Sequence, residues 1–301
     1  MARVAFLFPG QGAQSVGMAR DLCATLPQAR QLFDKASALL GYDLLDVCVN
    51  GPVERLNSTV VSQPALFTAS LAALEALKQS HPQVLDECVA AAGLSLGEFT
   101  ALTFAGVLTF EEGLRLVQRR GEAMQAAADR TPGGMVSVLM LEQTKVEELC
   151  AAARQKEILQ IANYLCPGNY AVSGHRSACD RLEPLVTEAG GRAVRLAVAG
   201  AFHTPLMKPA SEAMAEVFAS VPLAPPRLPV WSNVTAEPHR SPEEIRVLLQ
   251  RQITEPVRWE ETMRHVLAVG CERFYEIGPG RVLAGLLKRI QRKVDCHQVS
   301  A

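Results

Sequence analysis

The sequence predicts an α/β protein with a parallel central sheet and a small inserted α+β subdomain. Short apolar runs of strand length, at residues 4–8, 88–92, 230–234 and 274–277, alternate with longer segments of helical period. Such alternation is typical of parallel strands that are connected by crossover helices. A further stretch, residues 131–198, has a rhythm of its own and therefore predicts a separate unit.

The inserted stretch follows the order strand, helix, strand, strand, helix, strand, which is the ferredoxin-like pattern. A capping box of Thr144 and Glu147 predicts the start of its first helix. We therefore expect a main α/β domain of residues 1–130 and 199–301, interrupted by a ferredoxin-like subdomain of residues 131–198. The expected strands of the subdomain are 135–141, 158–163, 170–173 and 193–198, and its second helix passes through Leu182.

Composition excludes several classes of protein. The 30 basic and 31 acidic side chains nearly balance, so no dominant basic face is expected to bind nucleic acid. No apolar run approaches the length that spans a bilayer, and residues 1–8 are too short for a secretory signal. The eight cysteines form neither C-x-x-C pairs nor clusters with histidine, so no metal site or disulfide framework is expected. We expect a monomeric, cytoplasmic protein without a bound cofactor.

A serine flanked by glycines is the candidate nucleophile. The G-L-S-L-G run of residues 93–97 directly follows a predicted strand and precedes a helical segment. This is the setting of a nucleophile elbow in an α/β-hydrolase-like core, where a sharp turn projects the serine and leaves no space for neighbouring side chains. Ser95 would also lie at a helix N-terminus, which favours developing negative charge. The alternative is a plain turn in which Ser95 caps the helix together with Glu98.

His203 is the candidate base. It lies between an apolar run at residues 196–202 and the Thr204-Pro205 helix start, which corresponds to the crevice where open α/β sheets bind ligands. A neutral imidazole there can take the Ser95 proton and return it to a leaving thiol. The alternative is a structural histidine that caps the helix. The other histidines lie in polar or helix-surface segments and are expected to be solvated: His81, His175, His239, His265 and His297.

No acidic residue fits the third position of a hydrolase triad. Asp129 lies at a linker and Asp180 lies inside the predicted subdomain, so neither follows a strand end. We therefore expect a Ser–His dyad whose imidazole is oriented by a neutral acceptor.

Arg120 is predicted to lie on the buried face of a helix. The segment 111–128 has helical period, and its apolar positions share one face with Arg120 in the middle. A buried guanidinium is unfavourable unless an anion pairs with it, and its fork matches a carboxylate. Two partners fit, namely an internal acid such as Glu98 or a carboxylate that arrives with the substrate.

These motifs resemble those of the malonyl-CoA:acyl carrier protein transacylases of type II fatty acid synthesis, which are related to polyketide synthase acyltransferase domains. The resemblance covers essentially the whole chain, and the order of the motifs makes chance similarity negligible. Besides the serine elbow, the matching motifs are Phe8-Pro9-Gly10-Gln11-Gly12, Gln63-Pro64-Ala65, Arg120-Gly121, Phe202-His203, Ser232-Asn233-Val234, Arg251-Gln252, Pro256-Val257 and Gly278-Pro279-Gly280.

The resemblance implies an [acyl-carrier-protein] S-malonyltransferase of fatty acid biosynthesis. Its substrates would be malonyl-CoA and the phosphopantetheine thiol of acyl carrier protein, and it would act by a ping-pong mechanism through an ester on Ser95 with His203 as base. The resemblance further implies an oxyanion hole of the Gln11 and Leu96 main-chain N–H groups and a malonyl carboxylate bound by Arg120. It also implies that Gln63 and Phe202 bind substrate. The Gln252 carbonyl would orient the imidazole, together with Asn233 on a neighbouring strand end.

The chain departs from the family pattern at two places. Leu94 stands where most members have histidine before the serine, and the segment 163–168 lacks a second polar residue common there. Competing interpretations are a serine thioesterase or hydrolase, an acyltransferase of polyketide assembly, and a noncatalytic carrier-binding module. A dinucleotide-binding protein using Gly10-Gln11-Gly12 fits poorly, because Ser15 replaces the third glycine.

Overall fold

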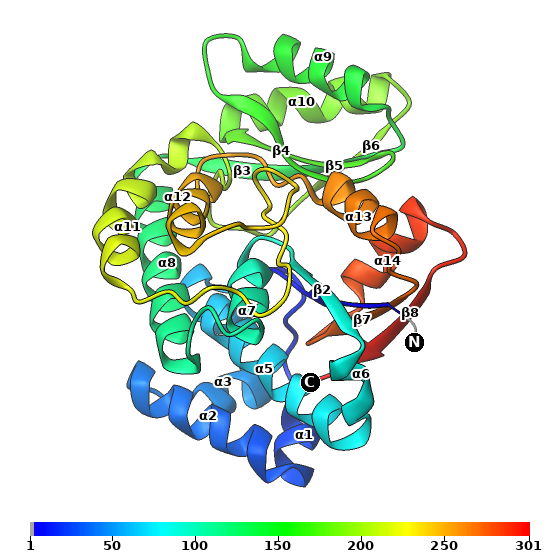
Figure 1. The fold of residues 1–301 in the computed structure, drawn as a ribbon. Coiled ribbons are helices and arrows are strands. Elements are labelled where there is room, and N and C mark those ends of the chain that lie inside the picture. Colours follow the sequence, from blue (N-terminus) through cyan, green and yellow to red (C-terminus); the bar gives the residue numbers. More distant parts are fainter. Residues whose placement is uncertain (1–2) are drawn as a thin grey trace.

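Four parallel strands form the central sheet of the computed structural model, in the order β2-β1-β7-β8 (Figure 1). The structure describes residues 3–301. The strands are β1 (Val4–Phe8), β2 (Cys88–Gly93), β7 (Arg273–Ile277) and β8 (Asp295–Val299). The predicted α/β fold with a parallel sheet is therefore confirmed.

Helices cover this sheet and connect its strands (Figure 1). Those before the subdomain are α1 (Arg20–Thr25), α2 (Pro27–Leu40), α3 (Leu44–Asn50), α4 (Val53–Asn57), α5 (Thr59–Ser80), α6 (Pro82–Asp86), α7 (Leu96–Phe104) and α8 (Phe110–Arg130). Those after it are the 3₁₀ turn η1 (Pro205–Met207), α11 (Lys208–Ser220), α12 (Pro242–Gln252), α13 (Trp259–Ala268) and α14 (Val282–Ile290).

Both faces of the sheet are buried. Phe6 and Phe8 of β1 point into a core shared with α2, α5, α7 and α8, whereas Leu7 points into a second core with Trp259 of α13 and Leu283 of α14. A strand that is buried on both faces needs apolar side chains at every position. This explains why β1 is an uninterrupted apolar run that the sequence makes easy to find.

Helix α5 corrects one expectation. It is long and apolar enough to cross a membrane, although no such run was expected from the sequence. In the structure 83% of its apolar window is buried, and it packs against α2, α7 and α8 as the core helix of the larger unit. The length of this helix is hard to recognise in the sequence because scattered Ser, Thr and Gln residues interrupt its apolar positions.

The strand predicted at residues 230–234 is reduced to isolated bridges. Val230 pairs with Ala91 of β2, and Trp231 pairs with Pro238. The chain then turns, with the Ala236 N–H donating to the Ser232 carbonyl. The apolar residues are buried as predicted, but the turn uses the main-chain groups that a longer strand would need.

A second sheet forms the smaller unit at the top of Figure 1. Its order β4-β5-β3-β6 is antiparallel at the β4-β5, β5-β3 and β3-β6 pairs, which is the ferredoxin-like arrangement. The elements lie within the predicted range 131–198 and are β3 (Gly133–Leu139), α9 (Gln143–Arg154), β4 (Leu159–Cys166), β5 (Asn169–His175), α10 (Arg176–Glu188) and β6 (Arg192–Arg195). The predicted capping box is wrong, because α9 begins two residues earlier than a Thr144 cap requires, at Gln143, with Glu142 as N-cap and no side-chain cap.

Strand β4 joins the two units. The Tyr164 N–H donates to the Val257 carbonyl, and the Val257 N–H donates to the Ala162 carbonyl. Helices α13 and α14 also pack against β4. The smaller sheet is thereby fixed over the carboxyl ends of β1 and β2, where the candidate site lies.

Candidate active site

Ser95 occupies a strained turn between β2 and α7. Its φ of 51° and ψ of −102° lie in a region that residues with a side chain rarely adopt, and its hydroxyl does not cap the helix. A Cβ on Gly93 would lie 1.9 Å from the Gly97 carbonyl carbon, and a Cβ on Gly97 would lie 2.0 Å from the Phe8 carbonyl oxygen. Glycine is therefore a steric requirement at both positions.

The His203 imidazole faces this hydroxyl. Its Nε2 lies 2.8 Å from Ser95 Oγ, and its Nδ1 lies 2.7 Å from the main-chain carbonyl oxygen of Gln252. Because a carbonyl oxygen only accepts, Nδ1 carries the proton and Nε2 presents its lone pair to Ser95. The arrangement is a dyad whose histidine is held by a neutral acceptor.

Arg120 lies beside the same hydroxyl, on the buried face of α8. The residue is 1% exposed, and its Nη2 donates to Ser95 Oγ at 3.0 Å and to Gln252 Oε1 at 3.0 Å. Its Nη1 donates to Gln63 Oε1 at 2.7 Å, and the guanidinium carbon lies 5.3 Å from the centre of the Phe99 ring. Within residues 3–301 no carboxylate forms an ion pair with it, so Glu98 is not its direct partner.

A cavity of about 220 Å³ connects these groups. Ser95, Arg120 and His203 line it, together with Gln11, Leu96 and Phe202. Most of the remaining wall is apolar and comes from both units: Leu94, Met124, Met135, Leu165, Leu196 and Leu286. The sheet of the smaller unit lines one part of the cavity, and Val282 and Leu286 of α14 line another.

Two main-chain amides beside Ser95 are candidates for an oxyanion hole. Gln11 follows β1 and Leu96 starts α7, and both line the cavity. Within residues 3–301 neither N–H donates to a protein acceptor. A free N–H at a helix N-terminus beside the nucleophile is suited to a developing oxyanion.

Two predicted site residues have different contacts from those expected. Gln63 does not line the cavity but supports Arg120 from behind, with its Nε2 donating to the Met124 sulfur at 3.7 Å. Asn233 does not contact His203. Its Oδ1 accepts from the Ser95 N–H at 2.6 Å and its Nδ2 donates to the Gly93 carbonyl at 2.7 Å, so it braces the elbow.

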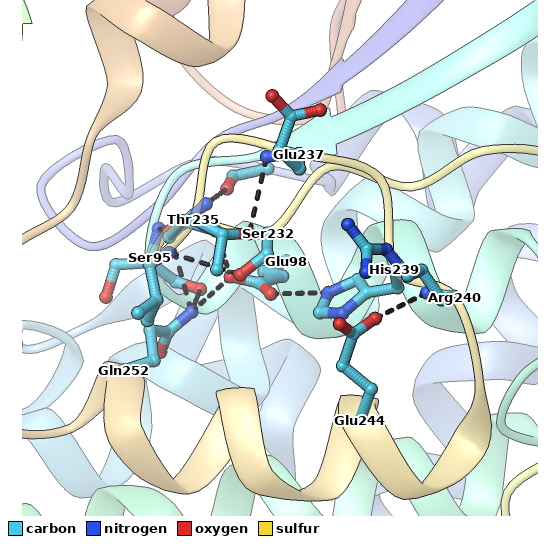
Figure 2. A network of polar contacts seen from close by, with 12 residues as sticks. Ser95, Glu98, Ser232, Thr235, Glu237, His239, Arg240, Glu244 and Gln252 are labelled. Atoms are coloured by element: carbon cyan, nitrogen blue, oxygen red, sulfur yellow. Dashed lines mark hydrogen bonds and ion pairs between the residues drawn. The ribbon is translucent and has the colours of Figure 1, made fainter.

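The histidine predictions need one correction. His239 was expected to be solvated, but it is 6% exposed and its Nε2 lies 2.8 Å from Glu98 Oε1 (Figure 2). Sequence reasoning considered Glu98 only as a capping residue or as the partner of Arg120. The loop that carries His239 has no periodicity, so no pattern in the sequence indicates that this loop folds back against α7.

Burial lowers the pKa of both basic groups of the site. Burial, followed by the nearby Arg120 charge, lowers the pKa of His203 from 6.5 to about 4. Burial also lowers the pKa of Arg120 to about 10, while the Glu98 carboxylate acts in the opposite direction. At neutral pH the imidazole is therefore neutral and the guanidinium is charged, which is the combination that a general base beside an anion-binding group requires.

The chain is similar to known proteins over nearly its whole length. Residues 5–300 match the family model of the acyl transferase domain. The chain is 43% identical over 300 residues to the mitochondrial malonyl-CoA-acyl carrier protein transacylase of Mus musculus, covering 95% of this chain and 78% of that one. It is 39% identical over 305 residues to the malonyl CoA-acyl carrier protein transacylase of Escherichia coli K12, covering 100% and 96%.

Solved structures show the same similarity. The malonyl-CoA:acyl carrier protein transacylase of Xanthomonas oryzae superposes with a TM-score of 0.95 at 40% identity, covering 99% of this chain and 95% of that one. A type II polyketide synthase acyl carrier protein has been solved in complex with its malonyl-transacylase, and that structure superposes with a TM-score of 0.94 at 38% identity, covering 100% and 96%.

Proposed function

The chain belongs to the malonyl-CoA:acyl carrier protein transacylases, and from that premise we propose that it moves a malonyl group from coenzyme A to the phosphopantetheine thiol of an acyl carrier protein through an ester on Ser95. One observation carries the proposal: Ser95 Oγ lies 2.8 Å from His203 Nε2 and 3.0 Å from Arg120 Nη2 in a shared cavity. The pathway served is fatty acid biosynthesis.

In the first half-reaction Ser95 Oγ attacks the thioester carbonyl carbon while its proton passes to His203 Nε2. The charge that develops on the carbonyl oxygen is stabilised by the N–H groups of Gln11 and Leu96. The carbon–sulfur bond then breaks, the proton returns from Nε2 to the sulfur, and coenzyme A leaves as a thiol.

The second half-reaction runs in reverse with a new thiol. The phosphopantetheine sulfur attacks the malonyl ester after giving its proton to His203 Nε2, and Ser95 regains the proton as the ester bond breaks. An imidazole that is neutral at rest serves in both directions, because it must accept a proton at the start of each half-reaction.

Arg120 makes the transfer selective for an acyl group that carries a carboxylate. Its present partners are neutral oxygens, so its charge is available to a malonyl carboxylate, which fits the guanidinium fork. An acetyl group would leave that buried charge unpaired. Phe202, beside His203 in the cavity wall, adds bulk that disfavours an α-methyl branch.

A hydrolase shares the elbow and the base, so the decisive experiment follows the acyl-enzyme. Intact-mass measurement after mixing with malonyl-CoA is expected to show a stable malonyl adduct that peptide mapping assigns to Ser95. Ser95→Ala should show none. Rapid loss of the adduct to free malonate without a thiol acceptor would instead identify a thioesterase.

The exposed end of α14 is a candidate docking surface for the acidic carrier protein. Val282 and Leu286 of this helix line the cavity, and Lys288 and Arg289 lie at its far end, followed by Arg292 and Lys293. Reversing charge at Lys288 and Arg292 should raise the carrier KM and leave exchange with free coenzyme A unchanged. An unchanged carrier KM would remove this surface from the proposal.

Carriers of polyketide assembly form a second candidate partner class. The similar structure in complex with a type II polyketide synthase carrier favours it. Comparing kcat/KM for fatty acid and polyketide carriers measures whether the second class is also used. A monomeric state and a cytoplasmic location complete the proposal, and light scattering together with cell fractionation tests them.

A further inference from the structure

Gln252 connects the reacting groups of the proposed active site. Its main-chain carbonyl accepts from His203 Nδ1, and its side-chain Oε1 accepts from Arg120 Nη2 at 3.0 Å. Its Nε2 donates to the Ser95 carbonyl oxygen at 3.0 Å. One residue at the end of α12 therefore contacts the base, the anion-binding group and the turn that carries the nucleophile.

The orientation of the Gln252 amide matters for Arg120. With Oε1 toward the guanidinium, a donor meets an acceptor. With the amide reversed, the NH₂ group would face the guanidinium, two donors would meet without an acceptor, and the guanidinium would lose its position beside Ser95 Oγ. Something must therefore fix the direction of this amide.

Glu98 supplies the shorter of two such constraints, the other being the Ser95 carbonyl oxygen (Figure 2). Its Oε2 accepts from Gln252 Nε2 at 2.7 Å and from the Asn233 main-chain N–H at 3.1 Å. An ionised carboxylate only accepts, so it holds the NH₂ side of the amide toward itself and turns Oε1 toward Arg120. Asn233, fixed by the same oxygen, accepts in turn from the Ser95 N–H.

His239 holds Glu98 in place. Its Nε2 lies 2.8 Å from Glu98 Oε1, and both side chains are 0% exposed. The second oxygen is thereby anchored, so the first stays directed at Gln252 and Asn233. Neither Glu98 nor His239 lines the cavity, and neither contacts Ser95 Oγ or His203.

We propose that Glu98, anchored by His239, is a positioning residue that fixes the Gln252 amide and thereby aligns Arg120 with the turn that carries Ser95. The inference rests on the proposed function, because it assigns the alignment of that reaction's groups. A role of this kind affects the choice of acyl group as well as the rate, since Arg120 and the turn that carries Ser95 contact the same amide.

Three variants test the inference, each compared with the wild type. Glu98→Met keeps the size of the side chain and removes both acceptors. Glu98→Gln restores one acceptor, and Glu276→Gln is the matched control, because Glu276 is equally buried but contacts only main-chain N–H groups of α14. Two readouts are measured: the ratio of malonyl to acetyl kcat/KM, and the rate at which an uncharged fluorophosphonate labels Ser95.

In Glu98→Met we expect malonyl kcat/KM to fall about 100-fold, the malonyl-to-acetyl ratio to fall about 10-fold, and labelling to slow by about 10-fold. Glu98→Gln should recover part of each loss, and Glu276→Gln should change neither the ratio nor labelling per folded molecule. A folded Glu98→Met with the wild-type ratio and labelling rate would overturn the inference.

His239→Leu covers the case in which Glu98→Met does not fold. It keeps Glu98 but removes the anchor, and we expect a smaller loss in the same ratio, recovered by His239→Gln, whose amide can donate to Glu98. An unchanged ratio in His239→Leu also overturns the inference. A wild type that labels with fluorophosphonate but forms no malonyl ester contradicts the proposed function instead, and the labelling rates of the variants then still decide the role of Glu98.

Discussion

Two glutamates among residues 3–301 are fully buried, and they are held in different ways. The carboxylate of Glu276 caps the start of α14. Its Oε1 accepts from the Leu283 N–H at 3.0 Å, and its Oε2 accepts from the Ala284 N–H at 2.8 Å. Glu98 is held by the side chains of Gln252 and His239 and by one main-chain N–H of Asn233. Glu276 is held by main-chain groups, which a helix fixes in direction. Glu98 is held mainly by side chains, whose orientation can vary.

The difference separates stability from catalysis. A carboxylate at a helix N-terminus is compensated by fixed N–H dipoles and needs no other function. Glu98 instead holds movable side chains beside a strained serine, a buried arginine and a buried histidine. Strained and buried polar groups that gather at one place are expected of a functional site. Changes around Ser95 should therefore alter chemistry more than folding, and changes around Glu276 should do the reverse.

The largest effect is expected from His203→Ala. Without the imidazole no group within reach of Ser95 Oγ accepts its proton, so formation of the malonyl ester should slow by between about 100- and 10,000-fold. The rate of adduct formation by rapid-quench mass spectrometry measures this. The melting temperature should not fall, because the variant no longer buries a polar ring; a rate within about tenfold of wild type would contradict the dyad.

Arg120→Ala comes next. Losing a charge-assisted contact to the malonyl carboxylate should lower malonyl kcat/KM by about 100-fold. Acetyl kcat/KM should rise, because no unpaired guanidinium is left in the cavity. Parallel assays with malonyl-CoA and acetyl-CoA measure both values. Equal losses for the two substrates would show that Arg120 serves the turn around Ser95 rather than the acyl group.

The sequence predicts the apolar framework better than the polar one. Apolar patterns in the sequence predict the strands β1, β2 and β7 and the buried face of α8, because burial of apolar side chains creates those patterns. Strand β8 was missed, since its residues Asp295–Val299 lie at an edge of the sheet and none of them is fully buried. An edge strand leaves little apolar pattern to detect.

Candidate site residues divide in the same way. Ser95 could be found because its turn requires glycines at fixed positions, and His203 and Arg120 because each interrupts an apolar pattern. The contacts of Asn233, Gln63 and His239 depend on how distant loops meet, which neither propensity nor spacing specifies. The resemblance to a family supplied part of this information, but it assigned Asn233 to the histidine rather than to the elbow.

The pH dependence of Ser95 reactivity tests whether the His203 imidazole beside it is buried and neutral. Only neutral His203 accepts a proton, and its pKa is lowered from 6.5 to about 4. Labelling of Ser95 by an uncharged fluorophosphonate should therefore lose half its rate near pH 4, and at pH 5 it should run about 30-fold faster than a base of pKa 6.5 would allow. An acid midpoint near 6.5 would contradict the burial of the imidazole.

Protonation of His203 also changes the free energy of unfolding with pH. Between pH 6.5 and about 4 the unfolded chain binds a proton at His203 that the folded chain does not, so this group lowers stability as the pH falls through that window. In Arg120→Ala the labelling midpoint should move to higher pH, because one of the two causes of the lowered pKa is removed.

Glu276→Gln tests the other region. Its amide NH₂ group would face the N–H donors of α14, so we expect a loss of about 1–3 kcal/mol in the free energy of unfolding. Urea denaturation measures it. Malonyl transfer per folded molecule should stay within about twofold of wild type, since the carboxylate contacts no group of the cavity. A stability loss of the same size with a large loss of kcat would mean that α14 aligns the active site.

The smallest effect is expected for a carboxylate that is not buried. Glu111 pairs with Lys35 at 2.9 Å, and the two side chains are 37% and 61% exposed. The hydrogen bond from Lys35 lowers the pKa of Glu111, so the pair contributes above the ordinary carboxyl pKa and loses its effect as pH falls through the lowered value. Because water screens the pair, Lys35→Met should change the free energy of unfolding by less than about 1 kcal/mol, and 1 M salt should remove most of that difference. A larger loss that persists in salt would mean that contacts on the surface, and not burial, determine what a carboxylate contributes here.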